Sequence, residues 1–196
     1  MWSVGSGKML GIPSLNTDTT TNEFCKSMYN SKVENLICRS CYSMSMLKTF
    51  RKNCTPKFSR NSKYLSEKVQ DRKTLPICPN MVGRFSSHGE LINSNHLENL
   101  INICLNQPMT TFTLWTKRKD IVNRVLKNIK KPKNLILVYS NPIINKLDVK
   151  LPKHFDKVFN NVKSKTNNVN CDSKCLDCMK CYTLGEPTTQ IIEVIK

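Results

Sequence analysis

The chemistry of this sequence is concentrated in its cysteines, of which there are ten. Four of them form a C-x3-C-x2-C-x2-C run near the end of the chain: Cys171, Cys175, Cys178 and Cys181. Four thiolates packed so closely can wrap one compact site, as dense cysteine runs do around the iron–sulfur clusters of bacterial ferredoxins. Structural zinc sites more often draw two thiolates from each of two separated pairs, so the crowding favours iron–sulfur over zinc. A redox-active thiol cluster without metal is the remaining alternative.

A second group of cysteines lies towards the N-terminus, where Cys25 is followed by Cys38 and Cys41 in a C-x12-C-x2-C arrangement. Three thiolates are one too few for closed tetrahedral coordination. A [4Fe–4S] cluster held by three cysteines leaves one iron open to a ligand such as S-adenosylmethionine. In the alternative, Cys25 is unrelated, and Cys38 and Cys41 are half of a zinc site that Cys54 or Cys78 completes.

The tripeptide His88-Gly89-Glu90 adds groups that can bind a small molecule. Glycine permits a close approach of the backbone to a ligand, and glutamate can pair with an ammonium group. A histidine in such a loop is expected to be solvated. The segment Gly5-Ser6-Gly7-Lys8 is not a P-loop, because the first glycine is missing and Met9 replaces the magnesium-binding Ser or Thr.

These groups must be positioned by a regular βαβαβ pattern over residues 82–141. A short strand from Gly83 to Gly89 precedes a helix over 94–106, where apolar residues recur at helical spacing. Cys104 lies on that apolar face and is expected to be part of the core. The remaining elements are a strand over 110–117, a helix over 118–130 and a buried strand over 134–141.

Such alternation places the chain in the α/β class, with parallel strands and covering helices. The architecture is predicted to be an open doubly wound sheet or a partial β/α barrel. In both, functional groups lie at the carboxyl ends of the strands. The loops at 88–90, 116–118 and 140–141 should therefore share one rim, with four side chains lining its substrate side: Thr116, Lys117, Ser140 and Asn141.

The flanking segments complete one domain over residues 1–196. A first strand is expected within Lys8 to Leu15, and the cysteine-bearing loop and helix over 18–56 follow it. Helical segments are expected near 42–53 and 61–72, and the last cysteines lie within 170–183. Further strands are expected at 156–162 and 188–196, separated by a polar linker over 163–170.

The composition limits the functions to be considered. The formal net charge is +17, which favours a polyanionic partner such as nucleic acid. The alternative is that a Lys-, Asn- and Ile-rich composition reflects an AT-rich genome. No apolar run is long enough to span a bilayer, and the N-terminus does not resemble a signal peptide, so a cytoplasmic location is expected. In that reducing compartment, clustered cysteines favour metal ligation over disulfides.

The motifs resemble those of the bacteriophage "gene product 88" family. That resemblance implies that the protein is located in the cytoplasm of the phage's host cell. The resemblance rests on the cysteine-rich loop ending in Cys-Tyr, the RF-initiated strand with its Gly-acidic pair, the aromatic-Thr strand and the closing C-x2-C pair. In this sequence those motifs are Cys38, Cys41 and Tyr42; Arg84, Phe85, Gly89 and Glu90; Trp115 and Thr116; and Cys175, Cys178 and Cys181. The resemblance covers most of the chain.

More distantly, the layout is similar to radical S-adenosylmethionine proteins, which are partial β/α barrels. That resemblance implies an open [4Fe–4S] cluster on Cys25, Cys38 and Cys41, with S-adenosylmethionine oriented by Gly89 and Glu90. It implies an auxiliary cluster at the C-terminal cysteines and an electron-donating partner. We therefore expect a radical S-adenosylmethionine-like enzyme, with nucleic acid or a nucleotide as substrate. The alternative is a non-enzymatic, zinc-stabilised, basic nucleic-acid-binding protein.

Overall fold

Seven strands form a single sheet in the computed structural model, which describes residues 1–147, 149–183, 185 and 188–195. They follow one another across the sheet in chain order, β1 to β7. All neighbouring pairs are parallel except β1 and β2. The strands are β1 (Trp2–Val4), β2 (Pro13–Leu15), β3 (Val82–Phe85), β4 (Thr111–Thr116), β5 (Leu135–Ser140), β6 (Lys157–Val162) and β7 (Gln190–Val194).

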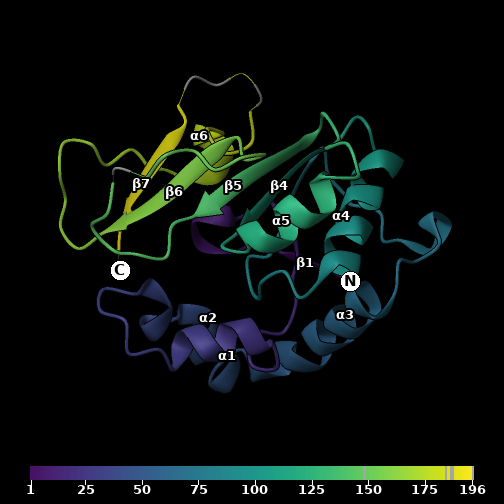
Figure 1. Ribbon diagram of the computed structural model, residues 1–196, viewed down its shortest axis with the longest axis horizontal. Helices are drawn as coiled ribbons and strands as arrows, with labels where there is room; N and C mark the ends of the chain where they lie inside the picture. The colour runs from purple at the N-terminus through teal and green to yellow at the C-terminus, as the bar shows by residue number, and fades with distance from the viewer. Residues whose placement is uncertain (148, 184, 186–187, 196) are drawn as a thin grey trace.

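Six α-helices connect and cover these strands in the described part of the chain. They are α1 (Glu23–Tyr29), α2 (Tyr42–Lys48), α3 (Thr55–Glu67), α4 (Ser94–Asn106), α5 (Lys119–Leu126) and α6 (Cys175–Cys178). Four short 3-10 helices lie at Gly7–Met9, Ile37–Ser40, Lys52–Cys54 and Arg72–Thr74. Figure 1 shows α1 and α2 as a separate layer beneath the strands, with α3 beside them. None of the helices in the described residues has both the length and the apolar character needed to cross a membrane.

The predicted α/β class is confirmed, and the strand order tests one of the two predicted architectures, whereas the barrel-like one stays a prediction. A doubly wound sheet reverses its strand order at a switch point. Here β2 to β7 run sequentially without a reversal, so the doubly wound alternative is wrong. The loops that follow β3, β4 and β5 leave the same edge of the sheet because these strands are parallel. The predicted common rim is therefore present.

The two faces of the sheet are covered differently. Side chains alternate along a strand, so Leu135 and Leu137 of β5 point to one face and Ile136 and Val138 to the other. Leu135 and Leu137 belong to the main core, together with buried residues of α3, α4 and α5. Ile136 and Val138 pack in a smaller cluster with Phe159 and Ile191, against which Cys171 and Cys181 are placed. We call this second side the cysteine face.

The elements of the βαβαβ core were predicted closely because their apolar residues recur with a clear period. The helix at Ser94–Asn106 has the predicted bounds, and Cys104 is a fully buried core residue as expected. Two elements are shorter than predicted. Strand β3 ends at Phe85 rather than Gly89, because Ser86 turns the chain with a φ of 60°. Helix α5 begins at Lys119 and ends at Leu126 rather than spanning 118–130.

The N-terminal region departs further from the predictions. The expected strand within Lys8–Leu15 is confined to Pro13–Leu15, and β1 pairs with it antiparallel. Helix α1 lies within what was expected to be loop. Asn22 caps it by accepting a hydrogen bond from the Cys25 amide at 3.2 Å. Such a cap satisfies an amide of the first turn that has no partner within the helix.

Candidate functional site

The first cysteine group lies at the carboxyl edge of the parallel strands. Cys25 is in the first turn of α1, and Cys41 directly precedes α2. Cys38 is in the 3-10 turn between these helices, and that turn is docked on the loop after β5. Leu36 forms an antiparallel bridge with Ile143, and the Ile37 amide donates to the Pro142 carbonyl at 2.9 Å. The docking brings Cys38 next to the end of β5, a strand that is distant from Cys38 in the sequence.

The structure brings the three thiols into mutual electrostatic contact. Burial raises the pKa of Cys25, and nearby Glu90, Cys41 and Cys38 raise it further, whereas Lys117 lowers it. Burial also raises the pKa of Cys38, which Lys117 again opposes. The Lys117 ammonium therefore stands among the three thiols and the carboxylate of Glu90. A fixed cation beside several thiols favours their deprotonated, metal-binding form.

The three cysteine thiols are suitable ligands for a metal, but their side chains are not arranged around a common metal position in this structure. Within the described residues, no three Cys, His, Asp or Glu side chains are arranged to hold a metal ion. All ten cysteines are free of disulfide bonds. The three thiols of the first group would have to draw together around a metal or a cluster.

Glu90 is placed by the ends of two strands. It is 5% exposed, and its Oε1 accepts hydrogen bonds from the Thr116 hydroxyl at 2.5 Å and from the Leu91 amide at 2.8 Å. Its Oε2 accepts from the Lys117 amide at 2.9 Å. We expected this carboxylate to pair with a ligand's ammonium group. In the structure its partners are protein groups, and the nearest ammonium belongs to Lys117.

Gly89 is required by a contact within the chain. Its φ is +81°, and a Cβ atom there would lie 2.1 Å from the Thr17 hydroxyl oxygen and 2.6 Å from the Thr17 carbonyl oxygen. The Gly89 amide donates to the Thr19 hydroxyl at 2.9 Å. We expected the glycine to admit a ligand, but the close approach is to the loop after β2. This contact joins the two loops that flank the cysteines.

His88 is buried rather than solvated, which corrects the expectation from sequence. It is 5% exposed, and its Nδ1 lies 2.7 Å from the Ser43 hydroxyl oxygen of α2. Its ring packs against Tyr42 and Phe58. Burial, together with Arg51 and Arg84, lowers its pKa to about 4, so the ring is neutral near pH 7. His88 therefore fastens the helix that follows Cys41 to the loop after β3.

The other predicted rim residues divide into two kinds. Ser140 accepts a hydrogen bond from the Lys117 ammonium at 3.2 Å, so both lie beside the first cysteine group. Asn141 is 3% exposed and donates to the Lys146 carbonyl and the Asn160 side chain. Its side-chain oxygen accepts from the Ile143 amide. Asn141 thus holds the loop after β5 on which Cys38 is docked, and Thr116 is similarly occupied by Glu90.

The second cysteine group lies on the cysteine face of the sheet. Cys175 and Cys178 begin and end α6, and Cys171 donates its amide to the Ile192 carbonyl of β7 at 3.1 Å. Burial raises the pKa of Cys171 to about 11 and that of Cys181 to about 12. The charges of other cysteines in the group raise both pKa values further.

A family model described as gene product 88 matches residues 4–189, a span that includes both cysteine groups. The chain belongs to the gene product 88 family. The resemblance inferred from the motifs is thereby confirmed. Searches of curated proteins and of solved structures find no match to the chain. Membership of the gene product 88 family supplies no activity, so the function has to be inferred from the site.

The remaining cysteines of this gene product 88 family member lie apart from the first group. Cys78 is 6% exposed in the main core, just before β3 begins, whereas Cys38 and Cys41 lie at the opposite, carboxyl end of the strands. Cys54 closes the 3-10 turn before α3. Neither is among the groups whose charges act on Cys25 or Cys38. The zinc alternative that uses one of them has no support from this arrangement.

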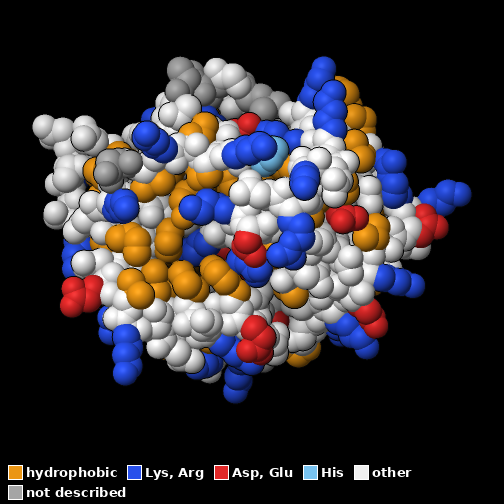
Figure 2. Space-filling view, viewed as in Figure 1, with side chains coloured by type: hydrophobic (Ala, Val, Ile, Leu, Met, Phe, Trp, Pro, Cys, Tyr) orange, Lys and Arg blue, Asp and Glu red, His pale blue; other side chains and the backbone are white. Residues whose placement is uncertain are grey.

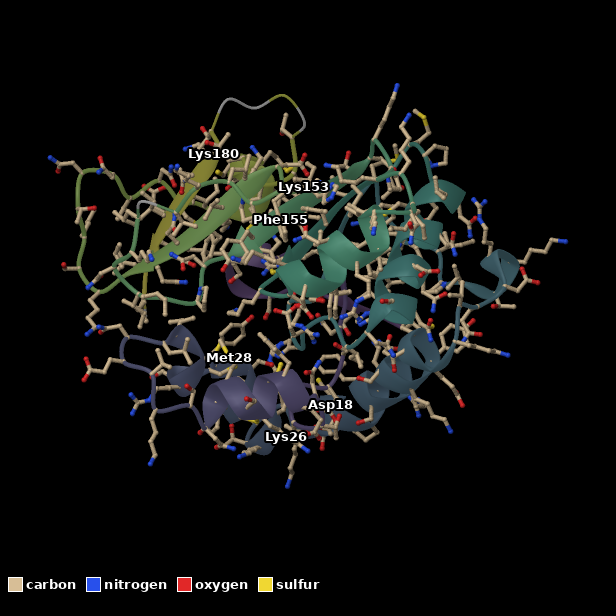
Figure 3. All side chains as sticks on the ribbon, in the orientation of Figure 1. Asp18, Lys26, Met28, Lys153, Phe155 and Lys180 are labelled. Atoms are coloured by element: carbon tan, nitrogen blue, oxygen red, sulfur yellow. The ribbon has the colours of Figure 1, made fainter. Side chains whose placement is uncertain are left out.

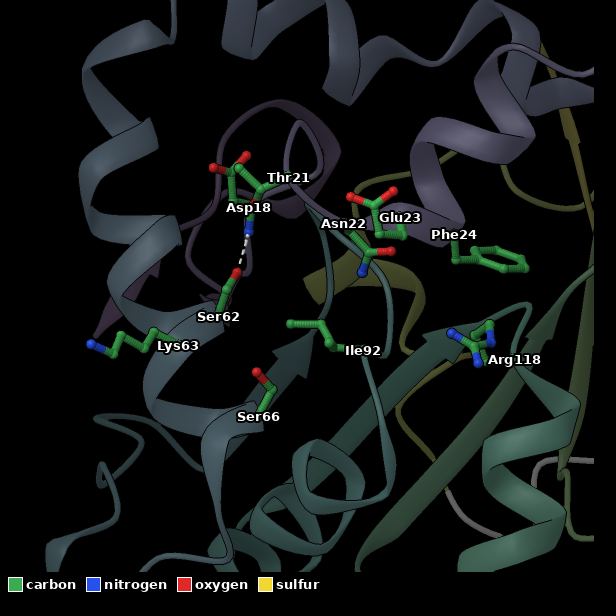
Figure 4. A pocket seen from close by; sticks show the side chains of 10 residues that line it. All are labelled: Asp18, Thr21, Asn22, Glu23, Phe24, Ser62, Lys63, Ser66, Ile92 and Arg118. Atoms are coloured by element: carbon green, nitrogen blue, oxygen red, sulfur yellow. Dashed lines mark hydrogen bonds between the residues drawn. The ribbon is translucent and has the colours of Figure 1, made fainter.

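An open cavity of about 360 Å³ lies beside the first cysteine group. Figure 4 shows its lining, in which Phe24 of α1 stands above Arg118. The Arg118 guanidinium lies 4.9 Å from the centre of the Phe24 ring. Phe24 precedes Cys25 and Arg118 follows Lys117, so the cavity and the thiols share two chain segments. Side chains extend into the space between the α1–α2 layer and the strands (Figure 3).

The sequence reasoning did not identify Arg84 as a functional residue. It lies on β3 between Gly83 and Phe85, and the main-core position of Phe85 puts Arg84 on the cysteine face. Its charge acts on Cys175, Cys181 and both Tyr42 and Tyr182. The period-two alternation of a buried strand could have revealed it, because an arginine there needs a partner.

Proposed function

We propose that this protein is an iron–sulfur protein of the radical S-adenosylmethionine-like type, in which Cys25, Cys38 and Cys41 hold an open [4Fe–4S] cluster. One observation carries the proposal. Three thiols from separate segments lie around the Lys117 ammonium, at the carboxyl edge of a sequentially ordered parallel sheet. A sequential order of parallel strands is also found in β/α barrels, whose functional groups lie at this edge, and this supports the proposal. Bound there, an open cluster would supply the electron that cleaves the sulfonium of S-adenosylmethionine.

The residues of the chain have defined tasks in this proposal. Glu90 fixes the end of β4 and places the Lys117 ammonium through its backbone. Gly89 holds the loops after β2 and β3 together, so that the backbone at the rim is set before a ligand binds. Lys117 and Ser140 line the rim next to the thiols. Thr116 and Asn141 support these positions through hydrogen bonds that they donate to Glu90 and Asn160, respectively. In this assignment Gly89 and Glu90 orient S-adenosylmethionine through the loop they fix.

The substrate proposed is a nucleic acid or a nucleotide, and the net charge of +17 supports it. Figure 2 shows Lys and Arg side chains spread around the visible face, without a continuous basic stripe. The cavity beside Cys25 offers an aromatic ring and a guanidinium, Phe24 and Arg118, on which a base can stack. An external one-electron donor is the partner that this chemistry requires.

The test is anaerobic purification followed by iron, sulfide and zinc analysis with a visible spectrum. We expect a brown protein whose iron and sulfide are reduced, but not abolished, by Cys38→Ser. The matched control is Cys104→Ser, at a core cysteine remote from both groups. Loss of all iron in Cys38→Ser, or no loss, would contradict the two-site assignment.

The second candidate is a zinc-stabilised, non-enzymatic protein that binds nucleic acid, and the same net charge favours it. A colourless protein with zinc and no iron would establish this candidate over the first. Its affinity for DNA or RNA should then fall by about 10³–10⁵ between about 50 and 200 mM salt, as for a protein making 6–10 phosphate contacts. A flat salt dependence would exclude it.

A further inference from the structure

The cysteine face of the sheet carries a buried cation that the proposed chemistry at the first group does not use. The guanidinium carbon of Arg84 lies 4.0 Å from the centre of the Trp115 ring, across the strand pair β3 and β4. One guanidinium nitrogen of Arg84 donates to the Met9 sulfur at 3.2 Å. No acidic residue is among the main charges that act on Arg84 in the described structure. Those charges belong to two tyrosines and to the cysteines of α6 and its flank: Tyr182, Tyr42, Cys181 and Cys175.

Three polar atoms at this place have no hydrogen-bond partner among the described residues. They are Nε of Arg84, Nε1 of Trp115 and the hydroxyl of Tyr182. Tyr182 is only 3% exposed, so water outside the protein does not reach that hydroxyl readily. Leaving a buried donor unpaired is destabilising, and native proteins seldom leave three such donors in one place. The three donors therefore indicate an acceptor, such as a thiolate sulfur, that the described side chains do not place within hydrogen-bond reach.

A small hollow separates these donors from the cysteines. It has a volume of about 30 Å³, and its walls include Trp115, Tyr182 and the four cysteines of the second group: Cys171, Cys175, Cys178 and Cys181. Arg84 stands behind Trp115 and faces Cys175 and Cys181. Two of the three donor residues, Trp115 and Tyr182, thus line the same hollow as the four cysteines.

A second cation reaches the same group at Cys171. The Lys8 ammonium pairs with Glu193 at 2.6 Å, donates to the Cys171 carbonyl at 2.7 Å and lies 3.8 Å from the Cys171 sulfur. Four thiolates around a divalent metal carry a net charge of about −2. Cysteine-ligated iron–sulfur clusters are likewise tuned by their net charge and by hydrogen bonds to sulfur. Two cations near the thiols and donors without a partner are what such an anionic site requires.

We propose that Arg84 is the buried counter-charge and positioning residue of an anionic four-thiolate metal site made by the second cysteine group. Trp115 and Tyr182 act with it as hydrogen-bond donors to the thiolate sulfurs. The proposal rests on the two-site assignment of the proposed function, in which the second group keeps its iron when Cys38 is replaced, and it adds the residues that set the stability and the potential of that second cluster. The charge requirement is the same for iron–sulfur and for zinc, so the experiment has one arm for each.

The experiment uses the full chain carrying Cys38→Ser, so that only the second site is read. In the iron arm, the chain is reconstituted anaerobically with ferrous iron and sulfide, and the midpoint potential is measured by a dye-mediated titration. In the zinc arm, the affinity for Zn²⁺ is measured by competition with a chromogenic chelator. Arg84→Gln is compared with Arg84→Lys, which keeps the charge. Arg124→Gln, at an exposed position on α5, is the matched control.

Arg84→Gln should favour the oxidised form about tenfold, a shift of about 59 mV for a one-electron couple, because a positive charge stabilises the more negative reduced state. In the zinc arm it should weaken binding about tenfold. Arg84→Lys should recover most of either change. Tyr182→Phe removes a hydroxyl that lies close to the Arg84 guanidinium but has no partner in hydrogen-bond geometry, and it should shift both readings in the same direction by a smaller factor.

The inference is overturned if Arg84→Gln and Tyr182→Phe both behave like the Arg124→Gln control, or if the Cys38→Ser chain binds neither metal. Failure of the proposed function is seen separately, by comparing wild-type with Cys38→Ser. If both chains hold the same amount of iron and sulfide, the first group holds no cluster, whatever the result at Arg84.

Discussion

The carboxylate of Glu90 accepts a hydrogen bond from the hydroxyl of Thr116, with 2.5 Å between the two oxygens. This contact joins the loop after β3 to the last residue of β4. The other carboxylate oxygen accepts from the next amide, that of Lys117, at 2.9 Å. Since the side chain of Lys117 reaches the first cysteine group, one buried carboxylate sets the geometry of two neighbouring loops and of the cation between the thiols.

Glu90→Gln should therefore destabilise the protein. The amide oxygen of glutamine can still accept from Thr116, but its amide nitrogen would face the Lys117 amide, which is also a donor. Loss of a charge-assisted hydrogen bond and the new donor–donor contact should lower the free energy of unfolding by about 1–3 kcal/mol. Urea denaturation measures this change. Glu98→Gln on α4 is the matched control, and an equal effect of the two substitutions would contradict the assigned role.

Gly89→Ala should lower the free energy of unfolding because of a steric clash, and not only because of the backbone conformation at this position. The new Cβ would lie 2.1 Å from the Thr17 hydroxyl oxygen and 2.6 Å from the Thr17 carbonyl oxygen, so the loop after β2 must move. We expect a loss of more than about 3 kcal/mol in the free energy of unfolding. Gly7→Ala is the comparison, because Gly7 has a φ of +61° and open space around it.

The Gly7 substitution should cost only about 1–2 kcal/mol, the price of a left-handed conformation. Thermal and urea unfolding of both variants measure the difference. If the two alanine variants lose similar stability, the contact between Gly89 and Thr17 does not hold the loops together.

The sequence predicted the elements whose hydrophobic period is long and regular. Helix α4 repeats its apolar residues over thirteen positions, and β5 is an unbroken apolar run, so both were placed within a residue. Helix α1 has only seven residues and no buried side chain, so it gives no periodic signal. Its start was nevertheless marked by Asn22 followed by Glu23, a capping residue before an acidic first turn.

The partners within the site were harder to predict than its residues. The cysteines and the loop at Gly89 are visible as motifs, but the docking of Cys38 on the loop after β5 depends on the pairing of Leu36 with Ile143, more than a hundred residues away. Glycine at position 89 predicts a tight approach without saying to what. The burial of His88 likewise comes from contacts with α2 and α3, which local sequence does not specify.

Acidification should weaken the fold through a buried histidine on α4. His96 is 1% exposed, its Nδ1 accepts a hydrogen bond from the Ile92 amide, and burial lowers its pKa to about 4. An unfolded histidine titrates near 6.5, so between these values the unfolded chain binds more protons than the folded one. Stability is therefore highest above about pH 6.5 and falls by about 3 kcal/mol as the pH drops to about 4.

The measurement is urea unfolding at several pH values for wild-type and His96→Gln. The variant should lose less stability between pH 6.5 and pH 4, even if it is less stable at neutral pH. His88, whose pKa is also lowered to about 4, should leave a residual slope in the variant. Parallel curves for the two proteins would show that His96 does not titrate in this way.

The reactivity of the first cysteine group should depend on the Lys117 ammonium. Burial raises the pKa of the Cys38 thiol, and Lys117 is the nearby cation that opposes this rise. Lys117→Gln removes the cation, so the thiol should hold its proton to higher pH, and the thiolate fraction at pH 8 should fall about threefold or more. Because only the thiolate reacts with iodoacetamide, the alkylation rate of Cys38 in metal-free protein should fall by the same factor.

Mass spectrometry of the alkylated peptides measures that rate residue by residue. Cys54 is an internal control, since it lies in the 3-10 turn before α3 and belongs to neither cysteine group, and its rate should be unchanged. Lys117→Arg keeps the charge and should restore most of the Cys38 rate, which separates the electrostatic effect from a general loosening of the rim. An unchanged Cys38 rate in Lys117→Gln, or an equal fall at Cys54, would show that the ammonium does not activate the group.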